Sequence, residues 1–127
     1  MKDVMSKIRE WYEIAGVKCY DSINMENYHE RKALRQQLIL EECVEFVDAQ
    51  REDDMVGIAD ALADLIYVIV GCALEYGIPL DKVFDEVQRS NMTKLRNGII
   101  KRDDGKILKG KDFEEPDIKS ILYPKEK

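Results

Sequence analysis

Residues 57–70 read GIADALADLIYVIV, a nearly continuous apolar stretch interrupted by two aspartates. The apolar pattern extends over residues 55–76 and is followed by a glycine and a proline, so it predicts a long helix that is apolar on almost every side. Such a helix belongs at the centre of a fold. A buried carboxylate is costly unless a cation meets it, so Asp60 and Asp64 require an explanation.

The preceding segment of the chain also combines an apolar helical pattern with carboxylates. Residues 38–49 read LILEECVEFVDA and lie within a helix predicted over about 29–52, which carries Glu41, Glu42 and Glu45. Helical residues three or four apart share a face. The short connection between the two helices predicts antiparallel packing. We therefore expect the two acidic sets to face each other across one seam.

Two further helices and one hairpin complete the predicted fold. Apolar spacing indicates helices over 3–15 and 80–94. Turn signals at Asn97-Gly98 and Asp104-Gly105, with short apolar runs between them, indicate a small β-hairpin over 99–109. The predicted class is all-α, a helical bundle of about four helices with a small C-terminal β-hairpin.

The chain is predicted to form a single domain over residues 1–127, with a core over 1–115 and a loose, proline- and charge-rich tail over 116–127. One chain has few helices with which to cover both faces of the helix at 55–76. We expect a second copy to bury the remaining apolar face, so that oligomerisation completes the bundle.

Composition narrows the possible partners. Apolar residues make up 45% of the chain, charged residues 36%, and the net charge is −6. This charge disfavours binding to a nucleic acid polymer, which needs a basic face. The longest apolar run, at 65–74, is too short to span a bilayer. With no visible signal peptide and three widely spaced cysteines, we expect a cytoplasmic protein without membrane partners.

The acidic residues of the two facing helices, here called the acidic seam, have two interpretations: a solvent-exposed charged surface or a metal-binding site. The glutamates at 41, 42 and 45 fit a solvated, ion-paired helix face equally well, and Asp60 fits a helix N-terminus. Asp64 lies a full turn deeper in an apolar helix and fits neither. A hard divalent cation such as Mg²⁺, with Mn²⁺ as a substitute, would offset the repulsion between the carboxylates.

The sequence lacks the residues that other metal sites and phosphate-binding sites require. Di-iron carboxylate bundles use Glu-x-x-His pairs, and the single histidine, His29, belongs to none. The stretch DDGK at 103–106 lacks the glutamate of a calcium loop, because Lys111 stands at its position 12. No P-loop is present. With these types of site excluded, the remaining candidate reaction is hydrolysis of a phosphoanhydride with Mg²⁺ as the cofactor.

The acidic motifs, EECVE at 41–45 and DALAD at 60–64, resemble the paired EExxE and ExxD motifs of the all-α nucleoside triphosphate pyrophosphohydrolase superfamily. Five stretches extend the resemblance to a MazG-like branch described as phosphoribosyl-ATP pyrophosphohydrolase-like: IREWYEIAGV (8–17), RQQLILEE (35–42), DALADLIYVIVGCALEYGI (60–78), RSNMTKL (89–95) and DGKILKGKDFEEPDI (104–118). Together these motifs are spread along the chain from residue 8 to residue 118.

The resemblance implies a reaction and a set of roles. A nucleoside triphosphate and water would give the monophosphate and pyrophosphate in a homodimer or homotetramer. Glu42, Glu45 and Asp64 would bind metal, together with Asp60, while the catalytic pair would be Glu41 and Glu42, with Glu41 serving as a ligand or as the base that orients water. One departure from the motif is Ala61, which replaces the glutamate of ExxD.

An acidic protein needs cations and polar groups to hold a triphosphate. The candidate substrate-binding residues are Arg35, Asn91, Lys94, Lys106 and Lys109. Exposed lysines on a hairpin more commonly serve solubility. Trp11 and Tyr12 are able to stack on a base, although their helical spacing fits a core or an interface better.

The sequence thus indicates an Mg²⁺-dependent pyrophosphohydrolase that acts on (d)NTPs and clears noncanonical or excess nucleotides. Two alternatives stay open. One is phosphoribosyl-ATP hydrolysis, and the other is a non-catalytic helical dimer that binds a nucleotide or a partner.

Overall fold

The computed structural model describes residues 1–125 and contains, within them, five α-helices and one short 3-10 helix. The chain divides into two compact units, Met1–Pro79 and Leu80–Lys127. The prediction that residues 1–127 form a single domain stays a prediction. The helical class is confirmed, and the four helices read from the sequence are all present.

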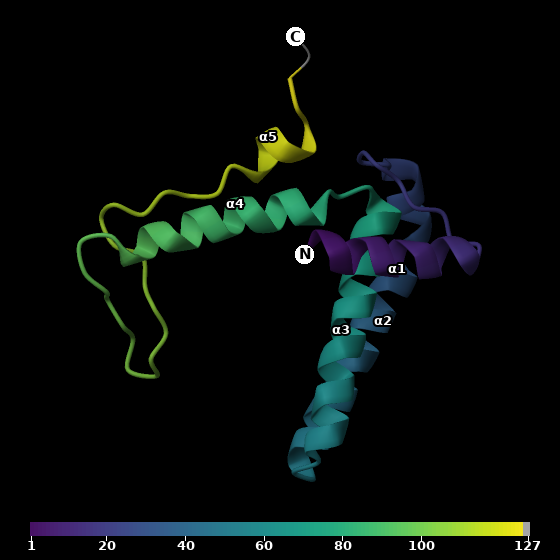
Figure 1. Cartoon of the computed structure of the whole chain (residues 1–127), viewed down its shortest axis with the longest axis horizontal. Coiled ribbons are helices and arrows are strands. Elements are labelled where there is room, and N and C mark those ends of the chain that lie inside the picture. The colour runs from purple at the N-terminus through teal and green to yellow at the C-terminus, as the bar shows by residue number, and fades with distance from the viewer. Residues whose placement is uncertain (126–127) are drawn as a thin grey trace. The chain divides into compact units, whose positions relative to one another are not determined.

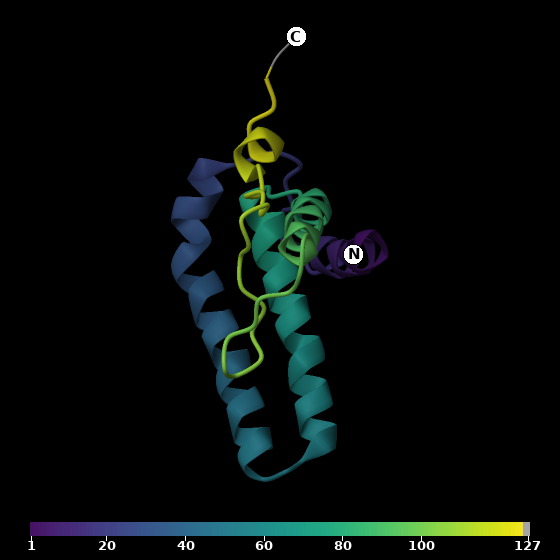
Figure 2. The same cartoon turned by 90° about the vertical axis from the view of Figure 1, so that its left-hand side faces the viewer.

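The first unit holds α1 (Lys2–Ile14), α2 (Met25–Arg51) and α3 (Met55–Tyr76). Helices α2 and α3 run antiparallel, side by side, and a short turn joins them (Figures 1 and 2). Helix α1 crosses this pair near the C-terminal end of α3 (Figure 1). The predicted seam between the two acidic helices therefore exists.

Capping residues define where these helices begin and end. The side chain of Asn24 accepts a hydrogen bond from the backbone N–H of Asn27 at 2.8 Å, which starts α2 four residues before the sequence prediction. Asp54 caps α3 in the same way. Gly77 ends α3 in the left-handed region, at φ 79°, and a Cβ there would lie 1.8 Å from the carbonyl oxygen of Ser22.

The core of the first unit is small and lies where α1 crosses α3. Ile8 and Tyr12 of α1 are buried there with Val70 and Leu74 of α3. Gly71 permits this close approach, because a Cβ at that position would lie 2.1 Å from the Tyr12 hydroxyl. The hydroxyl in turn accepts a hydrogen bond from Arg35 of α2 at 3.3 Å, so all three helices meet at one point.

A buried ion cluster ties α2 to α3. Glu75 is 1% exposed and Arg35 is also 1% exposed. The Arg35 guanidinium donates to Glu75 at 3.1 Å and to the carbonyl oxygen of Val68 at 2.6 Å. Arg31, one turn earlier on α2, donates to the other Glu75 oxygen at 2.5 Å. The cluster is well bonded, as a buried ion pair must be if it is to persist.

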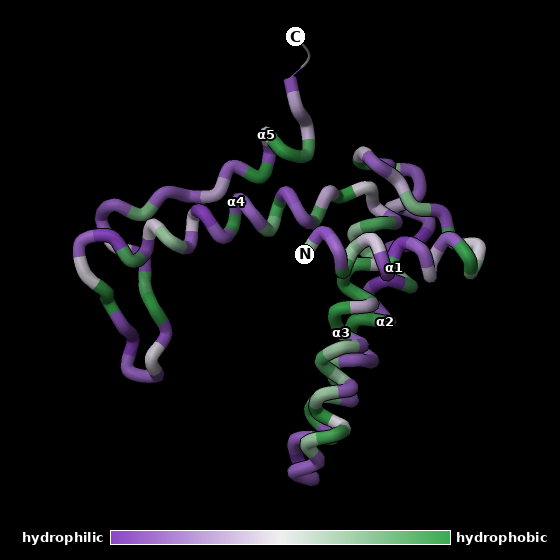
Figure 3. The backbone as a smooth tube through the Cα atoms, viewed as in Figure 1, coloured by the Kyte–Doolittle hydropathy of each residue, from purple (hydrophilic) through white to green (hydrophobic). Residues whose placement is uncertain are grey.

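Much apolar surface of the α2–α3 pair stays exposed in a single chain. Helix α3 is the most apolar element along its length (Figure 3). It is 22 residues long, and an 18-residue window within it has a mean hydropathy of 1.9, which by length and composition alone is enough to cross a membrane. It nevertheless carries Asp60, Asp64 and Glu75 and pairs with α2, which fits a helix packed against protein.

The second unit holds α4 (Leu80–Met92), the 3-10 helix η1 (Thr93–Leu95) and α5 (Ile118–Leu122). The segment around Glu114 is fastened to the end of α4. The Ser90 hydroxyl donates to the Glu114 carbonyl oxygen at 2.7 Å, and the Glu114 N–H donates to the Thr93 hydroxyl at 2.9 Å. Arg89 and Arg96 both pair with the Glu114 carboxylate.

The predicted β-hairpin over 99–109 is wrong. Within the described residues this segment forms a single antiparallel bridge, between Lys101 and Ile107, and no strand. Ile99 and Ile100 are half exposed. A two-stranded ribbon is marginal in water unless one face packs on other structure, so the turn around Gly105 forms without extending into strands.

The tail also differs from expectation. Residues 116–127 were expected to be loose, yet α5 occupies Ile118–Leu122, with the Asp117 side chain capping it through the Ser120 N–H at 3.2 Å. Residues 126–127 lie outside the described part of the chain.

The buried cluster yields a stability prediction. Replacing Glu75 by Gln leaves two guanidinium groups without their counter-charge, one of them fully buried. We expect a loss of about 3–5 kcal/mol in the free energy of unfolding, measured by urea denaturation. The matched control, Asp104→Asn, breaks the exposed pair with Arg102 and should leave the denaturation midpoint nearly unchanged. Equal midpoints for the two variants would contradict this account.

Candidate metal centre and adjoining pocket

Three acidic side chains converge between α2 and α3. Glu42, Glu45 and Asp64 each offer one carboxylate oxygen, and these oxygens all lie within 4.8 Å of one another. Glu42 and Glu45 are one turn apart on α2, whereas Asp64 comes from the facing turn of α3. The antiparallel packing of two amphipathic patterns thus brings together residues that lie 19 to 22 positions apart in the sequence.

The carboxylates of this cluster repel one another when no cation lies between them. Burial, then the charges of Glu45, Asp64 and Asp60, raise the pKa of Glu42. Its Oε2 atom is buried and has no hydrogen-bond partner in the described structure. Hard carboxylate oxygens with an unsatisfied acceptor suit Mg²⁺, which binds oxygen ligands at about 2.0–2.1 Å, and Mn²⁺, which prefers the same kind of ligand. The donor set therefore fits a divalent cation.

The other acidic candidates lie differently. Asp60 is outside the group of three, but it is near enough to contribute to the raised pKa of Glu42. Glu41 is exposed and accepts a hydrogen bond from Gln37 at 3.0 Å. Ala61, which replaces the motif's glutamate, is 2% exposed and packs in the core. A fourth carboxylate at the cluster would thus come from Asp60 and not from position 61.

A pocket of about 340 Å³ lies beside the cluster, between α1, α2 and α3. Glu42 and Asp64 line it together with Arg31 and Arg35. Its remaining walls are largely aromatic or aliphatic: Trp11, Tyr12, Val17, Leu38, Tyr67 and Val68. The pocket thus has a carboxylate side, a guanidinium side and flat apolar walls.

Of the candidate substrate-binding residues, Arg35 is the one in the first unit, and it lines this pocket. The ammonium nitrogens of Lys94 and Lys109 lie 5.9 and 4.9 Å from the centroid of the Phe113 ring. Lys109 also pairs with Glu115. Asn91 and Lys106 are exposed in the same second unit. The structure therefore places two of the four second-unit candidates near one aromatic ring.

Sequence reasoning missed Arg31 and Glu75. Glu75 carried a signal, because it is the sole charged residue in the second half of an apolar helix, residues 65–76. An arginine pair one turn apart on the facing helix, at 31 and 35, was its natural counterpart.

Carboxylates on two facing antiparallel helices are the arrangement that the resemblance to MazG-like all-α nucleoside triphosphate pyrophosphohydrolases implies. Comparison with protein families supports this class directly, since a family described as phosphoribosyl-ATP pyrophosphohydrolase matches residues 18–91. The chain belongs to this family, which is part of the MazG-like superfamily. It is on that ground an enzyme, a nucleotide pyrophosphohydrolase. A search of curated proteins found no match.

The raised pKa of Glu42 predicts a metal-dependent change in stability. A carboxyl group whose pKa is higher in the folded state contributes stability below its unfolded pKa and loses it as pH rises through the folded pKa. In EDTA at neutral pH, we expect Glu42→Gln to raise the thermal unfolding midpoint. Mg²⁺ should raise the midpoint of the parent protein and have little effect on the variant.

The matched control for this experiment is Glu30→Gln, an exposed glutamate earlier on the same helix. It should keep the parent's midpoint in EDTA and the parent's response to Mg²⁺. A midpoint for Glu42→Gln below the parent's in EDTA would contradict the account of a strained acidic cluster.

Proposed function

We propose that the protein is an Mg²⁺-dependent nucleoside triphosphate pyrophosphohydrolase that converts (d)NTP and water into (d)NMP and pyrophosphate. The observation that carries this proposal is the convergence of Glu42, Glu45 and Asp64 within 4.8 Å on facing helices of a family member. The biological role we propose is clearance of noncanonical or excess nucleotides from the cytoplasm, without a membrane or a nucleic acid polymer as partner.

In this proposal some acidic residues bind the metal and others take part in catalysis. Glu42, Glu45 and Asp64 hold the cation, with Asp60 as a further ligand, and Mn²⁺ substitutes for Mg²⁺. When bound, the cation neutralises phosphate charge and lowers the pKa of water. Glu41 and Glu42 are the proposed catalytic carboxylates, with Glu41 serving either as a further ligand or as the base that accepts a proton from the attacking water. The Glu41 side chain is exposed and bonded to Gln37, so its role rests on the sequence motif.

Five residues are proposed as substrate contacts. Arg35 belongs to the first unit, where it lines the pocket beside the acidic cluster. Asn91, Lys94, Lys106 and Lys109 belong to the second unit and are proposed as phosphate contacts on the ground of their charge and polarity alone. Lys94 and Lys109 both lie near the Phe113 ring, and Lys109 also pairs with Glu115.

Phosphoribosyl-ATP hydrolysis is the second candidate, and the description of the matched family favours it. Both reactions break the same kind of phosphoanhydride bond and use the same acidic cluster. Membership in a family of pyrophosphohydrolases argues against the third alternative, a non-catalytic binding dimer, which Ala61 in the second acidic motif had suggested.

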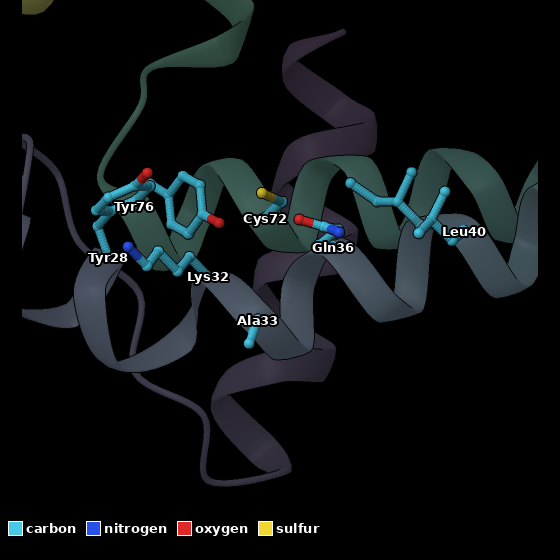
Figure 4. Close-up of a pocket in the computed structure, with 8 residues that line it drawn as sticks. Tyr28, Lys32, Ala33, Gln36, Leu40, Cys72 and Tyr76 are labelled. Carbon is cyan, nitrogen blue, oxygen red and sulfur yellow. The ribbon is translucent and has the colours of Figure 1, made fainter.

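We further propose that the working form is a homodimer or homotetramer. Exposed apolar residues recur at the same helical spacing on the two long helices: Leu40, Val44 and Val47 on α2, and Leu62, Ile66 and Ile69 on α3. Leu40 also lines a cavity of about 590 Å³ between the helices, bounded by Tyr28, Gln36 and Tyr76 among others (Figure 4). A second copy would bury these surfaces.

The reaction is tested by measuring pyrophosphate release from a panel of NTPs, dNTPs and phosphoribosyl-ATP, with Mg²⁺ and with EDTA. We expect Mg²⁺-dependent release that Asp64→Asn lowers by about 100-fold or more, since loss of a ligand removes several kcal/mol of charge stabilisation. The control, Asp48→Asn, changes an exposed α2 carboxylate and should keep full activity. Release that persists in EDTA would contradict the proposal.

The proposed assembly is tested by light scattering after size-exclusion chromatography. Val44→Asp places a charge in the apolar stripe of α2 and should shift the mass to that of one chain. Ile14→Asp changes a side chain on α1 that is 80% exposed and should leave the mass unchanged. A parent protein that elutes as a monomer would refute the proposed assembly.

A further inference from the structure

Two buried hydroxyl groups lie where α4 ends and η1 begins. Within the described part of the second unit, Ser90 and Thr93 are the fully buried residues, each 2% exposed. Serine and threonine are mostly exposed in folded proteins, and the best-buried residues of a small unit are ordinarily apolar. The bonds that a buried polar side chain makes explain why a fold retains it.

Both hydroxyls bind the backbone of one residue, Glu114, which lies 24 positions after Ser90. The Ser90 hydroxyl donates to the Glu114 carbonyl oxygen at 2.7 Å, and the Glu114 N–H donates to the Thr93 hydroxyl at 2.9 Å. The Thr93 hydroxyl in turn donates to the Ser90 carbonyl oxygen at 2.6 Å. We call this arrangement of Ser90, Thr93 and the Glu114 backbone the hydroxyl clamp. It satisfies both backbone groups of Glu114, as a neighbouring strand would.

The hydroxyl clamp closes a basic loop, which leaves the end of α4 and returns to it (Figure 1). Residues 94–113 form this loop and carry seven lysines and arginines against three aspartates, in a chain whose net charge is −6. Two further contacts join its legs. The Asn97 side chain bonds that of Asp112, and the Leu108 N–H donates to the Ile100 carbonyl oxygen at 2.8 Å. The loop therefore has a defined path that starts and ends at the clamp.

The hydroxyl clamp also determines where two lysines of this loop lie. Lys94 directly follows Thr93 and Phe113 directly precedes Glu114, so the clamp brings Lys94 and Phe113 together. The ammonium nitrogens of Lys94 and Lys109 lie 5.9 and 4.9 Å from the centroid of the Phe113 ring. An aromatic ring attracts a cation over its face. The position of one ring therefore orients two cations.

Ion pairs support the hydroxyl clamp from the solvent side. Arg89 and Arg96 both pair with the Glu114 carboxylate, and the bond from Arg96 is the main cause of its lowered pKa. The next residue, Glu115, pairs with Lys109 at 2.9 Å. These pairs are exposed, so each contributes little by itself. The buried hydroxyls are thus the fixed point from which the lysines are held.

We propose that the hydroxyl clamp positions Lys94 and Lys109 for the phosphates of the substrate. This inference rests on the proposed function, in which both lysines are phosphate contacts. Ser90 and Thr93 touch no substrate and act through the Phe113 ring. A flexible side chain loses conformational entropy when it binds a ligand, and holding it in place beforehand reduces that loss. Two lysines held on one ring therefore bind a polyphosphate more tightly than two lysines on a loose loop.

Thr93→Val removes the hydroxyl and leaves the Glu114 N–H without its acceptor, whereas Thr93→Ser keeps the hydroxyl. The measurement is calorimetric titration of the full chain with inorganic tripolyphosphate in Mg²⁺. Thr93→Val should weaken tripolyphosphate binding about tenfold, and Thr93→Ser should stay within about twofold of the parent. The control, Ser120→Ala, changes an exposed hydroxyl of α5 and should bind as the parent does. Parent-like binding by Thr93→Val, or no binding by the parent, would overturn the proposal.

A double-mutant cycle separates positioning from a purely structural role. In a background that carries both Lys94→Gln and Lys109→Gln, Thr93→Val should change the affinity for tripolyphosphate by less than about twofold, because the groups it positions are gone. An equal loss of affinity in both backgrounds would refute the proposal. If Thr93→Val loses helicity by circular dichroism, Ser90→Ala takes its place in the same cycle, since it removes the bond to the Glu114 carbonyl oxygen alone.

The two proposals fail separately. Tripolyphosphate binding that depends on the Thr93 hydroxyl, without pyrophosphate release from any nucleotide, would support the hydroxyl clamp and end the proposed reaction. Metal-dependent pyrophosphate release with the same KM in the parent and in Thr93→Val would support the reaction and overturn the positioning role.

Discussion

The buried carboxylate of Glu75, held between Arg31 and Arg35, is the interaction on which the first unit depends. It fixes α2 against α3 at one end, and Arg35 carries the connection on to α1 through the Tyr12 hydroxyl. Glu42 follows Arg35 by two helical turns, and Asp64 precedes Glu75 by three. Because the helices run antiparallel, the register set by the ion cluster also sets which acidic residues meet. The structural charges and the candidate metal ligands are thus parts of one seam.

The seam is arranged with opposite charge at its two ends. Two guanidinium groups against one carboxylate leave the Glu75 end positive, whereas Glu42, Glu45 and Asp64 leave the other end negative. The positive end is satisfied almost entirely within the chain. The negative end is not, as the raised pKa of Glu42 indicates. The repulsion between these carboxylates lowers the stability of the fold and at the same time gives the site affinity for a cation. Functional sites commonly lower stability in this way.

Sequence patterns predicted the helical elements and the acidic seam because both follow from local spacing. Asp64, a carboxylate deep in an apolar helix, was the informative residue, and the structure does bring it to Glu42 and Glu45. The start of α2 was missed because its Asn24 cap follows an irregular stretch. The hairpin failed because isoleucines at 99 and 100 have no surface to pack on. The pocket was missed because Trp11, Arg31 and Tyr67 come from three helices, and no local pattern joins them.

The most direct test of the metal centre is anomalous diffraction from crystals grown with Mn²⁺. The account predicts an anomalous peak between α2 and α3, at about 2.0–2.3 Å from carboxylate oxygens of Glu42, Glu45 and Asp64. A second peak nearby that includes Asp60 would agree with a two-metal site. Well-ordered Glu42, Glu45 and Asp64 side chains without any anomalous density between them, at saturating Mn²⁺, would contradict the account.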